Sequence, residues 1–414
     1  MDLQDKKNKA STLDRQVIGI FGRPNVGKSS LLNALTGQDI AIVSPVSGTT
    51  TDPVIKHMEL SPIGPVSFID TAGIGDGTSL SDARDEKTRE QLRRSDLVIL
   101  VTDMESGLDP SELLFLGGID REIPIILFRN NFNASKSVSL VQELPPSLKD
   151  LTSISGNPLT MDGIDSLKEL IATKLKSPTR RLISDLLEPG DLVILVTPID
   201  TGAPKGRLIL PQQQTIREIL DAHAMAITVQ TEELAFTLKQ LKFKPKLIVT
   251  DSQVFKQVSA IVPKDIPLLS FSILFSRLKG DLKSQADAAL KINELSANDL
   301  ILIAEGCTHH RQCDDIGTVK LPRMLSQKTS HELRFDSTQG GQFPRELDPY
   351  KLILHCGACM LNTREMQNRL HLAANSGVAI TNFGLAIAHM TGILERCLDG
   401  LATLERGTTW NQSI

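Results

Sequence analysis

The chain of 414 residues is poor in aromatic side chains, which make up 4 % of it and include one Trp and one Tyr. Proteins that bind single-stranded nucleic acid by stacking depend on such side chains, so this class is disfavoured. The chain also lacks an excess of charge of one sign, because 45 Lys and Arg stand against 49 Asp and Glu, a net charge of −4. A general nucleic-acid or membrane-surface binder would carry a strong basic excess. We therefore expect no nucleic-acid partner and no membrane partner.

Long apolar runs are missing as well. The longest, such as residues 97–101 and 192–196, have the length of a strand and fall far short of the ~20 residues that cross a bilayer. The first sixteen residues are polar and lack the apolar core of a signal peptide. These features predict a cytoplasmic protein whose thiols stay reduced.

Cysteine is absent from the first 306 residues of the chain. The five cysteines are Cys307, Cys313, Cys356, Cys359 and Cys397. An odd number, gathered at one end, is not typical of a disulfide framework. In a reducing compartment, such clustering favours a metal site.

The pattern along the chain predicts an α/β fold. Short β-branched runs alternate with longer amphipathic stretches, which is typical of parallel strands joined by crossover helices. Residues 176–181, with Pro178 and two arginines, are typical of a linker between the first and the second set of strands and helices. A third set begins near Pro267. The length is that of about three domains. We predict domains at residues 1–177, 178–266 and 267–414, all of the α/β class.

Residues 22–29 fit the P-loop pattern G-x-x-x-x-G-K-[ST], between a predicted strand at 17–21 and a predicted helix at 29–36. Glycines let backbone N–H groups surround phosphates, and the helix N-terminus adds positive potential. Lys28 suits the terminal phosphates and the Ser29 hydroxyl suits Mg²⁺. The predicted nucleotide-binding residues here are Gly22, Arg23, Pro24, Asn25, Val26, Gly27, Lys28, Ser29 and Ser30.

Two further loops lie where a nucleotide hydrolase needs them. The sequence D-T-A-G follows a predicted strand, so Asp70 can hold Mg²⁺ through water and the Gly73 amide can meet the terminal phosphate. Thr49 and Thr50 lie in a G-T-T-T-D loop that could order over the metal. We predict Ser29, Thr50 and Asp70 around Mg²⁺, and catalytic roles for Lys28, Thr50 and Gly73.

Together these motifs resemble the GTPases of the Era and TrmE type, which carry G-x-P-N-V-G-K-S, G-T-T-x-D and D-T-A-G. In that group the loop Asn, here Asn25, helps bind K⁺, although an Asn at this point can also serve only as a turn former. An apolar residue, here Ile74, stands where other GTPases have a water-orienting Gln. The resemblance implies a P-loop GTPase domain that binds GTP and hydrolyses it slowly, with Mg²⁺ and assistance from K⁺.

The base-recognition motif departs from that group. Its N-K-x-D corresponds to residues 130–133, so Asn130 is kept and Asn133 replaces the Asp. A carboxylate there accepts two hydrogen bonds from guanine. An amide accepts only through its oxygen, and its NH2 group then faces the second N–H donor of guanine. Unpaired buried donors cost about 1–3 kcal/mol each, so we expect weakened guanine selectivity. Ser153 occupies the place of the last guanine-loop motif.

Two groups of potential metal ligands follow predicted strands in the last domain. Cys307 and His309 come after strand 300–304, and His355, Cys356 and Cys359 come after strand 352–354. Open parallel sheets place ligands at this edge. The residues alone allow two sites. One is a zinc site of three cysteines with His309 or His355, and the other is a [4Fe–4S] cluster on three cysteines with a weak or exchangeable fourth ligand.

The arrangement C-x-H, a long gap and H-C-x-x-C behind a small GTPase resembles the HydF family, the [FeFe]-hydrogenase maturation GTPases. The resemblance extends through a middle stretch at residues 200–211. It implies a [4Fe–4S] cluster on Cys307, Cys356 and Cys359, with His309 or His355 as possible fourth ligand. It also implies a scaffold that carries a transient binuclear iron precursor to the apo-[FeFe]-hydrogenase, two radical-SAM maturases as further partners, and a middle domain that mediates dimerisation. The functional unit would be a dimer or a tetramer.

The alternative is an RNA- or ribosome-associated GTPase of the Era type with a structural zinc site of three cysteines and one histidine. The slight acidity and the few aromatics disfavour it. Cys313 and Cys397 fall outside the motif, and Cys397 reads as a core residue because it lies in an amphipathic run.

Overall fold

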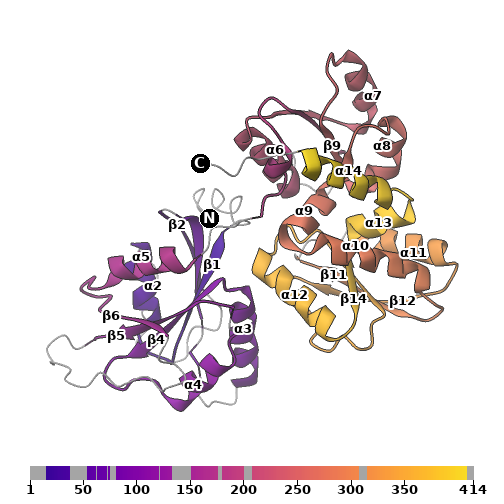
Figure 1. Ribbon diagram of the computed structural model, residues 1–414. Helices are drawn as coiled ribbons and strands as arrows, with labels where there is room; N and C mark the ends of the chain where they lie inside the picture. Colours follow the sequence, from indigo (N-terminus) through magenta and orange to yellow (C-terminus); the bar gives the residue numbers. More distant parts are fainter. Residues whose placement is uncertain are drawn as a thin grey trace. The chain divides into compact units, whose positions relative to one another are not determined.

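A computed structural model describes residues 15–37, 54–61, 63–71, 73–74, 81–120, 122–132, 151–175, 180–199, 208–306 and 315–407, with the side chains of 81–86 excepted. The chain forms two compact units, Met1–Pro178 and Thr179–Ile414. In Figure 1 the first unit runs from indigo to magenta and the second from there to yellow.

The first unit is built on one six-stranded sheet with the order β2-β3-β1-β4-β5-β6. The β2 strand is antiparallel to β3, and the other neighbours are parallel. The strands are β1 (Gln16–Phe21), β2 (Val54–Leu60), β3 (Gly64–Asp70), β4 (Leu97–Asp103), β5 (Ile125–Asn130) and β6 (Thr152–Gly156). The helices are α2 (Lys28–Thr36), α3 (Ser81–Arg94), α4 (Pro110–Gly117) and α5 (Ile164–Lys174).

Alternation along the buried strands supplies two cores, one on each face of this sheet. In β4, Leu97, Ile99 and Val101 join the core that contains α2 and α5 residues. Val98 and Leu100 join the core that contains Leu92 of α3 and Leu116 of α4. Successive side chains of a strand point to opposite faces, so a continuous apolar run indicates a sheet covered on both sides.

The second unit contains two four-stranded sheets, with the orders β10-β9-β7-β8 and β12-β11-β13-β14. All neighbours in them are parallel. The strands are β7 (Leu192–Val196), β8 (Met225–Val229), β9 (Leu247–Thr250), β10 (Leu268–Ser270), β11 (Leu300–Glu305), β12 (Arg334–Gln339), β13 (Leu352–His355) and β14 (Ala379–Asn382). The α/β prediction of one P-loop domain and two further parallel sheets is confirmed.

The helices of the second unit cover both sheets. They are η3 (Ser184–Leu186), α6 (Leu210–Asp221), α7 (Thr231–Gln240), η4 (Ser252–Val254), α8 (Phe255–Ile261), α9 (Phe271–Lys279), α10 (Leu282–Leu290), η5 (Lys291–Glu294), η6 (Ile316–Lys320), α11 (Leu321–Thr329), α12 (Thr363–Asn375), α13 (Phe383–Met390) and α14 (Leu394–Gly407). None of the helices in the described ranges is long and apolar enough to cross a membrane.

The last two helices return to the first sheet of this unit. Leu385 of α13 and Leu401 of α14 belong to the same core as Val193 of β7 and Val249 of β9. Cys397 is fully buried in this core, as its place in an amphipathic run predicts. The two sheets of the second unit therefore share buried helices and are packed as one body.

A glycine marks the closest approach in this packing. A Cβ added at Gly384 of α13 would lie 2.5 Å from Ser272 Cβ and 3.0 Å from Ser252 Oγ. We expect Gly384→Ala to destabilise the second unit by about 1–3 kcal/mol, because the added methyl group overpacks the contact of α13 with α9. A lower midpoint for one calorimetric transition would report this change.

Gly117→Ala is the matched control, because Gly117 ends α4 and no atom lies within 4 Å of its added Cβ. It should leave the transitions of the second unit in place. Equal midpoints for Gly384→Ala and the unmodified chain would contradict the packing argument.

Candidate functional site

The P-loop turns between β1 and α2 on two glycines that no other residue can replace without strain. Gly22 has a φ of 146° and Gly27 a φ of 94°. A Cβ at Gly22 would lie 2.3 Å from Val101 O, and one at Gly27 would lie 2.2 Å from Asn130 Nδ2. Asn25 is also left-handed, with a φ of 63°, a conformation that Asn tolerates better than most residues. The shape of the loop thus depends on three residues with positive φ, each of a type that tolerates this conformation.

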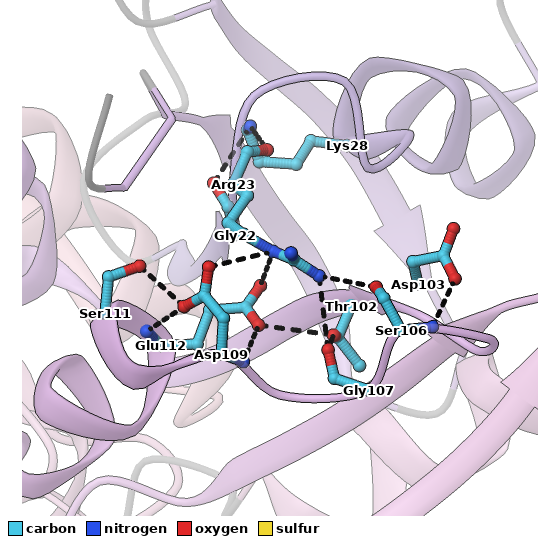
Figure 2. Close-up of polar contacts among 10 residues, drawn as sticks. All are labelled: Gly22, Arg23, Lys28, Thr102, Asp103, Ser106, Gly107, Asp109, Ser111 and Glu112. Carbon is cyan, nitrogen blue, oxygen red and sulfur yellow. Dashed lines mark hydrogen bonds and ion pairs between the residues drawn. The ribbon is translucent and has the colours of Figure 1, made fainter. Parts of the chain in front are cut away.

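Lys28 begins α2 and folds back over the loop. Its Nζ donates hydrogen bonds to Gly22 O at 3.1 Å and to Arg23 O at 2.8 Å, as Figure 2 shows. The side chain is buried, and this burial lowers the pKa of Lys28, while the charges of Asp70 and Glu112 oppose the shift. The two carbonyl groups hold the ammonium group in the mouth of the loop, where terminal phosphates would need it.

Asp70 and Ser29 lie together as the Mg²⁺ prediction requires. The Ser29 hydroxyl donates to Asp70 Oδ2 at 2.6 Å. Burial raises the pKa of Asp70, opposed by the Ser29 hydrogen bond and the charges of Lys28 and Lys56. Its buried Oδ1 has no hydrogen-bond partner among the described residues. A hydrated divalent cation would supply that partner and favour the charged carboxylate. Thr49 and Thr50 lie outside the described residues.

Gly73 and Ile74 lie directly against the P-loop. A Cβ at Gly73 would lie 2.6 Å from the Pro24 ring, and Ile74 N donates to Gly22 O at 3.1 Å. Ile74 itself is buried in the core with Phe21 and Leu116. An apolar residue therefore follows the D-T-A-G motif, and the Ile74 side chain cannot orient a water molecule.

Asn130 connects the end of β5 to the P-loop. It is fully buried, and its Nδ2 donates to Val26 O at 2.9 Å. Its Oδ1 has no hydrogen-bond partner in the part of the chain that the structure describes. Ser153 is exposed in the neighbouring β6, and Asn133 lies outside the described residues. The Asn of the base motif thus also supports the phosphate loop.

The sequence predicts Arg23 as a nucleotide-binding residue, but it does not indicate the contacts that the Arg23 side chain makes outside the P-loop. Its Nε lies 3.2 Å from Glu112 Oε1 and 3.4 Å from Asp109 Oδ2. Its Nη2 donates to Ser106 Oγ at 2.9 Å and to Gly107 O at 3.1 Å. Figure 2 shows the guanidinium group pointing to this segment and the Lys28 ammonium group pointing into the loop. Arg23 thus joins the P-loop to the start of α4.

Glu112 makes this contact rigid. Its side chain is fully buried, and its Oε2 accepts from Asp109 N at 3.1 Å and from the Thr102 hydroxyl at 3.3 Å. Asp109 in return accepts from Glu112 N, which completes a capping box at the N-terminus of α4. The same Arg23 residue therefore holds Lys28 through its carbonyl and α4 through its guanidinium group.

In the second unit, Cys356 and Cys359 follow β13 in a tight turn. Gly306 N donates to Cys356 Sγ at 3.0 Å, and Ala358 within the turn has a left-handed φ of 53°. Burial raises the pKa of Cys356 to about 11, and burial also raises the pKa of Cys359 against the nearby Lys279 charge. The raised pKa values mean that forming the thiolates is costly in the metal-free protein. A bound metal ion would offset this cost, because coordination keeps thiols deprotonated.

Part of the predicted ligand set is absent from the described ranges. Cys307, His309 and Cys313 lie outside them. Within them, no group of three or more His, Cys, Asp and Glu side chains could hold a metal. Glu305 ends β11 next to β13 and is buried, with its Oε2 accepting from Gln339. Cys356, Cys359 and the backbone donor to Cys356 Sγ fit a thiolate-bound metal or cluster.

His355 is fully buried, and both of its ring nitrogens are engaged. Nδ1 lies 2.8 Å from Cys356 O, and Nε2 lies 3.0 Å from Arg369 Nη1. A carbonyl group only accepts and a guanidinium group only donates, so the ring is neutral with its proton on Nδ1. Burial lowers the pKa of His355 to about 3, and the Arg369 charge adds to this shift. Coordination of a metal by Nε2 would require the Arg369 guanidinium group to move away from this nitrogen. A ligand role for His355 stays a prediction.

Comparisons with known proteins divide the chain in the same order. Residues 17–131 match the family described as 50S ribosome-binding GTPase. Residues 182–280 match the hydrogen maturase F dimerization domain, and residues 283–400 match the hydrogen maturase F tetramerization domain.

Individual relatives match over the first unit. The tRNA modification GTPase MnmE of Burkholderia orbicola is 32 % identical over 173 residues, which is 40 % of this chain and 36 % of that protein. MnmE of Legionella pneumophila subsp. pneumophila is 33 % identical over 174 residues, or 41 % and 37 %. The chain thus spans little more than a third of these relatives. The Aquifex aeolicus Era structure bound to GDP.AlF4- aligns with a TM-score of 0.37 at 18 % identity, covering 56 % of this chain and 99 % of that one.

The P-loop with its Lys28, Ser29 and Asp70 arrangement, on a mostly parallel sheet, defines a P-loop GTPase domain, and two further parallel α/β sheets follow it. The two maturase-specific matches together cover more than half of the chain. The chain belongs to the HydF family of hydrogen maturases.

Two variants separate the effect of the Arg23–α4 contact on GTP affinity from its effect on stability. Arg23→Met leaves Glu112 buried without its ion-pair partner, which costs about 1–3 kcal/mol. The double variant Arg23→Met and Glu112→Met removes both charges and should recover most of this stability. In both variants we expect GTP to bind about tenfold more weakly, a change of about 1.4 kcal/mol. Without its side-chain contacts to α4, residue 23 is no longer anchored, and its carbonyl group no longer holds Lys28 in place. Nucleotide titration and thermal unfolding measure the two effects.

Ser111→Ala is the control, since Ser111 touches Asp109 but not Arg23. It should bind GTP as the unmodified chain does. A double variant with full GTP affinity would show that the contact serves stability alone.

Proposed function

We propose that this chain is a GTP-hydrolysing scaffold that holds a binuclear iron precursor beside a [4Fe–4S] cluster and delivers it to apo-[FeFe]-hydrogenase. One observation carries the proposal. A chain of the hydrogen maturase family combines a preorganised P-loop with a C-x-x-C turn that follows a parallel strand and receives a backbone hydrogen bond at sulfur.

The nucleotide chemistry is transfer of the terminal phosphoryl group to water. Lys28 would neutralise charge on the phosphates, and Ser29, Thr50 and Asp70 would surround Mg²⁺. The Gly73 amide would bind the terminal phosphate, and Asn25 would contribute to a K⁺ site. Since Ile74 cannot orient water, hydrolysis by the isolated chain should be slow.

The cluster would be held by Cys307, Cys356 and Cys359, with His309 or His355 as possible fourth ligand. When bound, such a cluster supplies an iron with an exchangeable coordination position, to which a precursor can attach. The backbone N–H of Gly306 would donate to the Cys356 thiolate and stabilise its charge.

The family assigns self-association to the modules at residues 182–280 and 283–400. The apo-hydrogenase and two radical-SAM maturases would be the other partners. The P-loop and the cysteine turn lie in different units, so hydrolysis would change affinity for a partner rather than drive chemistry at the cluster.

The cluster assignment predicts a clear contrast between the half-buried Cys356 and the buried Cys397. Anaerobically reconstituted protein should be brown, with about four irons per chain and an EPR signal on reduction. Cys356→Ser should lose the visible absorption and the signal, because it removes a ligand. Cys397→Ser should keep both, since Cys397 lies in the apolar core.

A colourless protein with one zinc per chain would refute the cluster and favour the Era-type alternative. Retention of a complete cluster in Cys356→Ser would refute the ligand assignment.

Base selectivity gives a second test. With Asn133 in place of the Asp, XTP and ITP should compete with GTP in calorimetric titrations. Asn133→Asp should tighten GTP binding about tenfold and weaken XTP binding, because the carboxylate accepts both guanine donors. Asn131→Asp, which adds the same charge two positions earlier, should not. Tight GTP binding by the unmodified chain, without competition from XTP or ITP, would contradict the expectation.

A further inference from the structure

The cysteine turn is held by a side chain from the neighbouring module. Lys279 is the last residue of α9, which belongs to the segment matched by the dimerization domain. The turn at Cys356 and Cys359 belongs to the segment matched by the tetramerization domain. Lys279 is 1 % exposed, which is rare for an ammonium group and requires compensating contacts.

These contacts are the carbonyl groups of the turn. Lys279 Nζ donates to Leu361 O at 2.7 Å, to Ala358 O at 3.1 Å and to Cys359 O at 3.4 Å. Hydrogen bonds from a charged donor are stronger than neutral ones, and here three acceptors of one short segment converge on one ammonium group. The Phe275 ring lies 5.2 Å away and adds a favourable cation–π contact.

The backbone that carries Lys279 is itself fixed. Gln367 Nε2 of α12 donates to Lys279 O at 2.7 Å, and Arg180 donates to Gly280 O. Gly280 N also donates to Ser276 O at 2.9 Å, which closes the end of α9. The ammonium group is therefore presented from a rigid base to a turn that contains the left-handed Ala358. Such a conformation costs of order 1–3 kcal/mol and persists only when its surroundings hold it.

We propose that Lys279 is a positioning residue that keeps the C-x-x-C turn in the shape that binds the cluster, so that the dimerization module forms part of the cluster site. This inference rests on the proposed cluster. The Lys279 charge also lies beside two prospective thiolates, where it stabilises an anionic cluster and favours its reduction.

Amide hydrogen exchange on metal-free protein tests the positioning role without any cluster. In Lys279→Met we expect amides of residues 356–361 to exchange about tenfold faster, the scale of one lost charged hydrogen bond. Lys283→Met is the matched control, since Lys283 is exposed and pairs with Asp287. Amides of β7 and β9 report whether the unit stays folded. If they also exchange faster, Lys279→Gln replaces Lys279→Met. This variant loses the charge but keeps a polar side chain, so amides of residues 356–361 should exchange faster while those of β7 and β9 do not, and unchanged exchange at residues 356–361 would overturn the positioning role.

Cluster properties give the second readout. Reconstituted Lys279→Met should hold less iron per chain and show a lower midpoint potential in an EPR titration, because a positive charge is missing. Lys283→Met should match the unmodified chain in both. Unchanged exchange at residues 356–361 in Lys279→Met would overturn the positioning role. Absence of a cluster from the unmodified chain would overturn the proposed function, while the exchange data would still decide the role of Lys279.

Discussion

Parallel pairing of strands is the constraint on which both candidate sites depend. It brings the loops that follow successive strands to one edge of a sheet, whatever their separation in the chain. In the first unit the ends of β1 and β3 bring Ser29 and Asp70 into hydrogen-bond contact. In the second unit the ends of β11 and β13 bring Gly306 to Cys356. Neither site could be assembled from one continuous segment.

Both sites share an electrostatic property. The Asp70 carboxyl group is buried and the Cys356 thiol is half-buried, and desolvation raises the pKa of both groups, so neither charged form is fully stabilised by the protein alone. Fixed cationic groups lie nearby in each case, Lys28 in the P-loop and Lys279 at the cysteine turn. Such sites favour binding of a metal ion. The bound metal interacts favourably with the carboxylate or thiolate and so offsets the cost of desolvating that charge.

Much of the fold could be predicted because its strands are apolar runs of characteristic length. The strands β1, β4, β7, β11 and β13 were expected on this basis, and the structure contains them. The edge strand β12 was missed, since its residues are mostly exposed or half-buried and polar and carry no apolar period. The contact of Arg23 with Glu112 was also missed, because it joins segments far apart in the chain.

The sequence by itself determined the residue types and the local motifs: the P-loop, the D-T-A-G turn, the C-x-x-C pair and the family to which they point. These are properties of short segments, where backbone geometry and ligand chemistry restrict the choice of residue. Tertiary structure alone decided that His355 is held by Arg369, and that Lys279 of one module reaches the turn of the next. The physical reason is that buried polar groups take whichever partners packing brings to them, and packing joins segments that sequence separates.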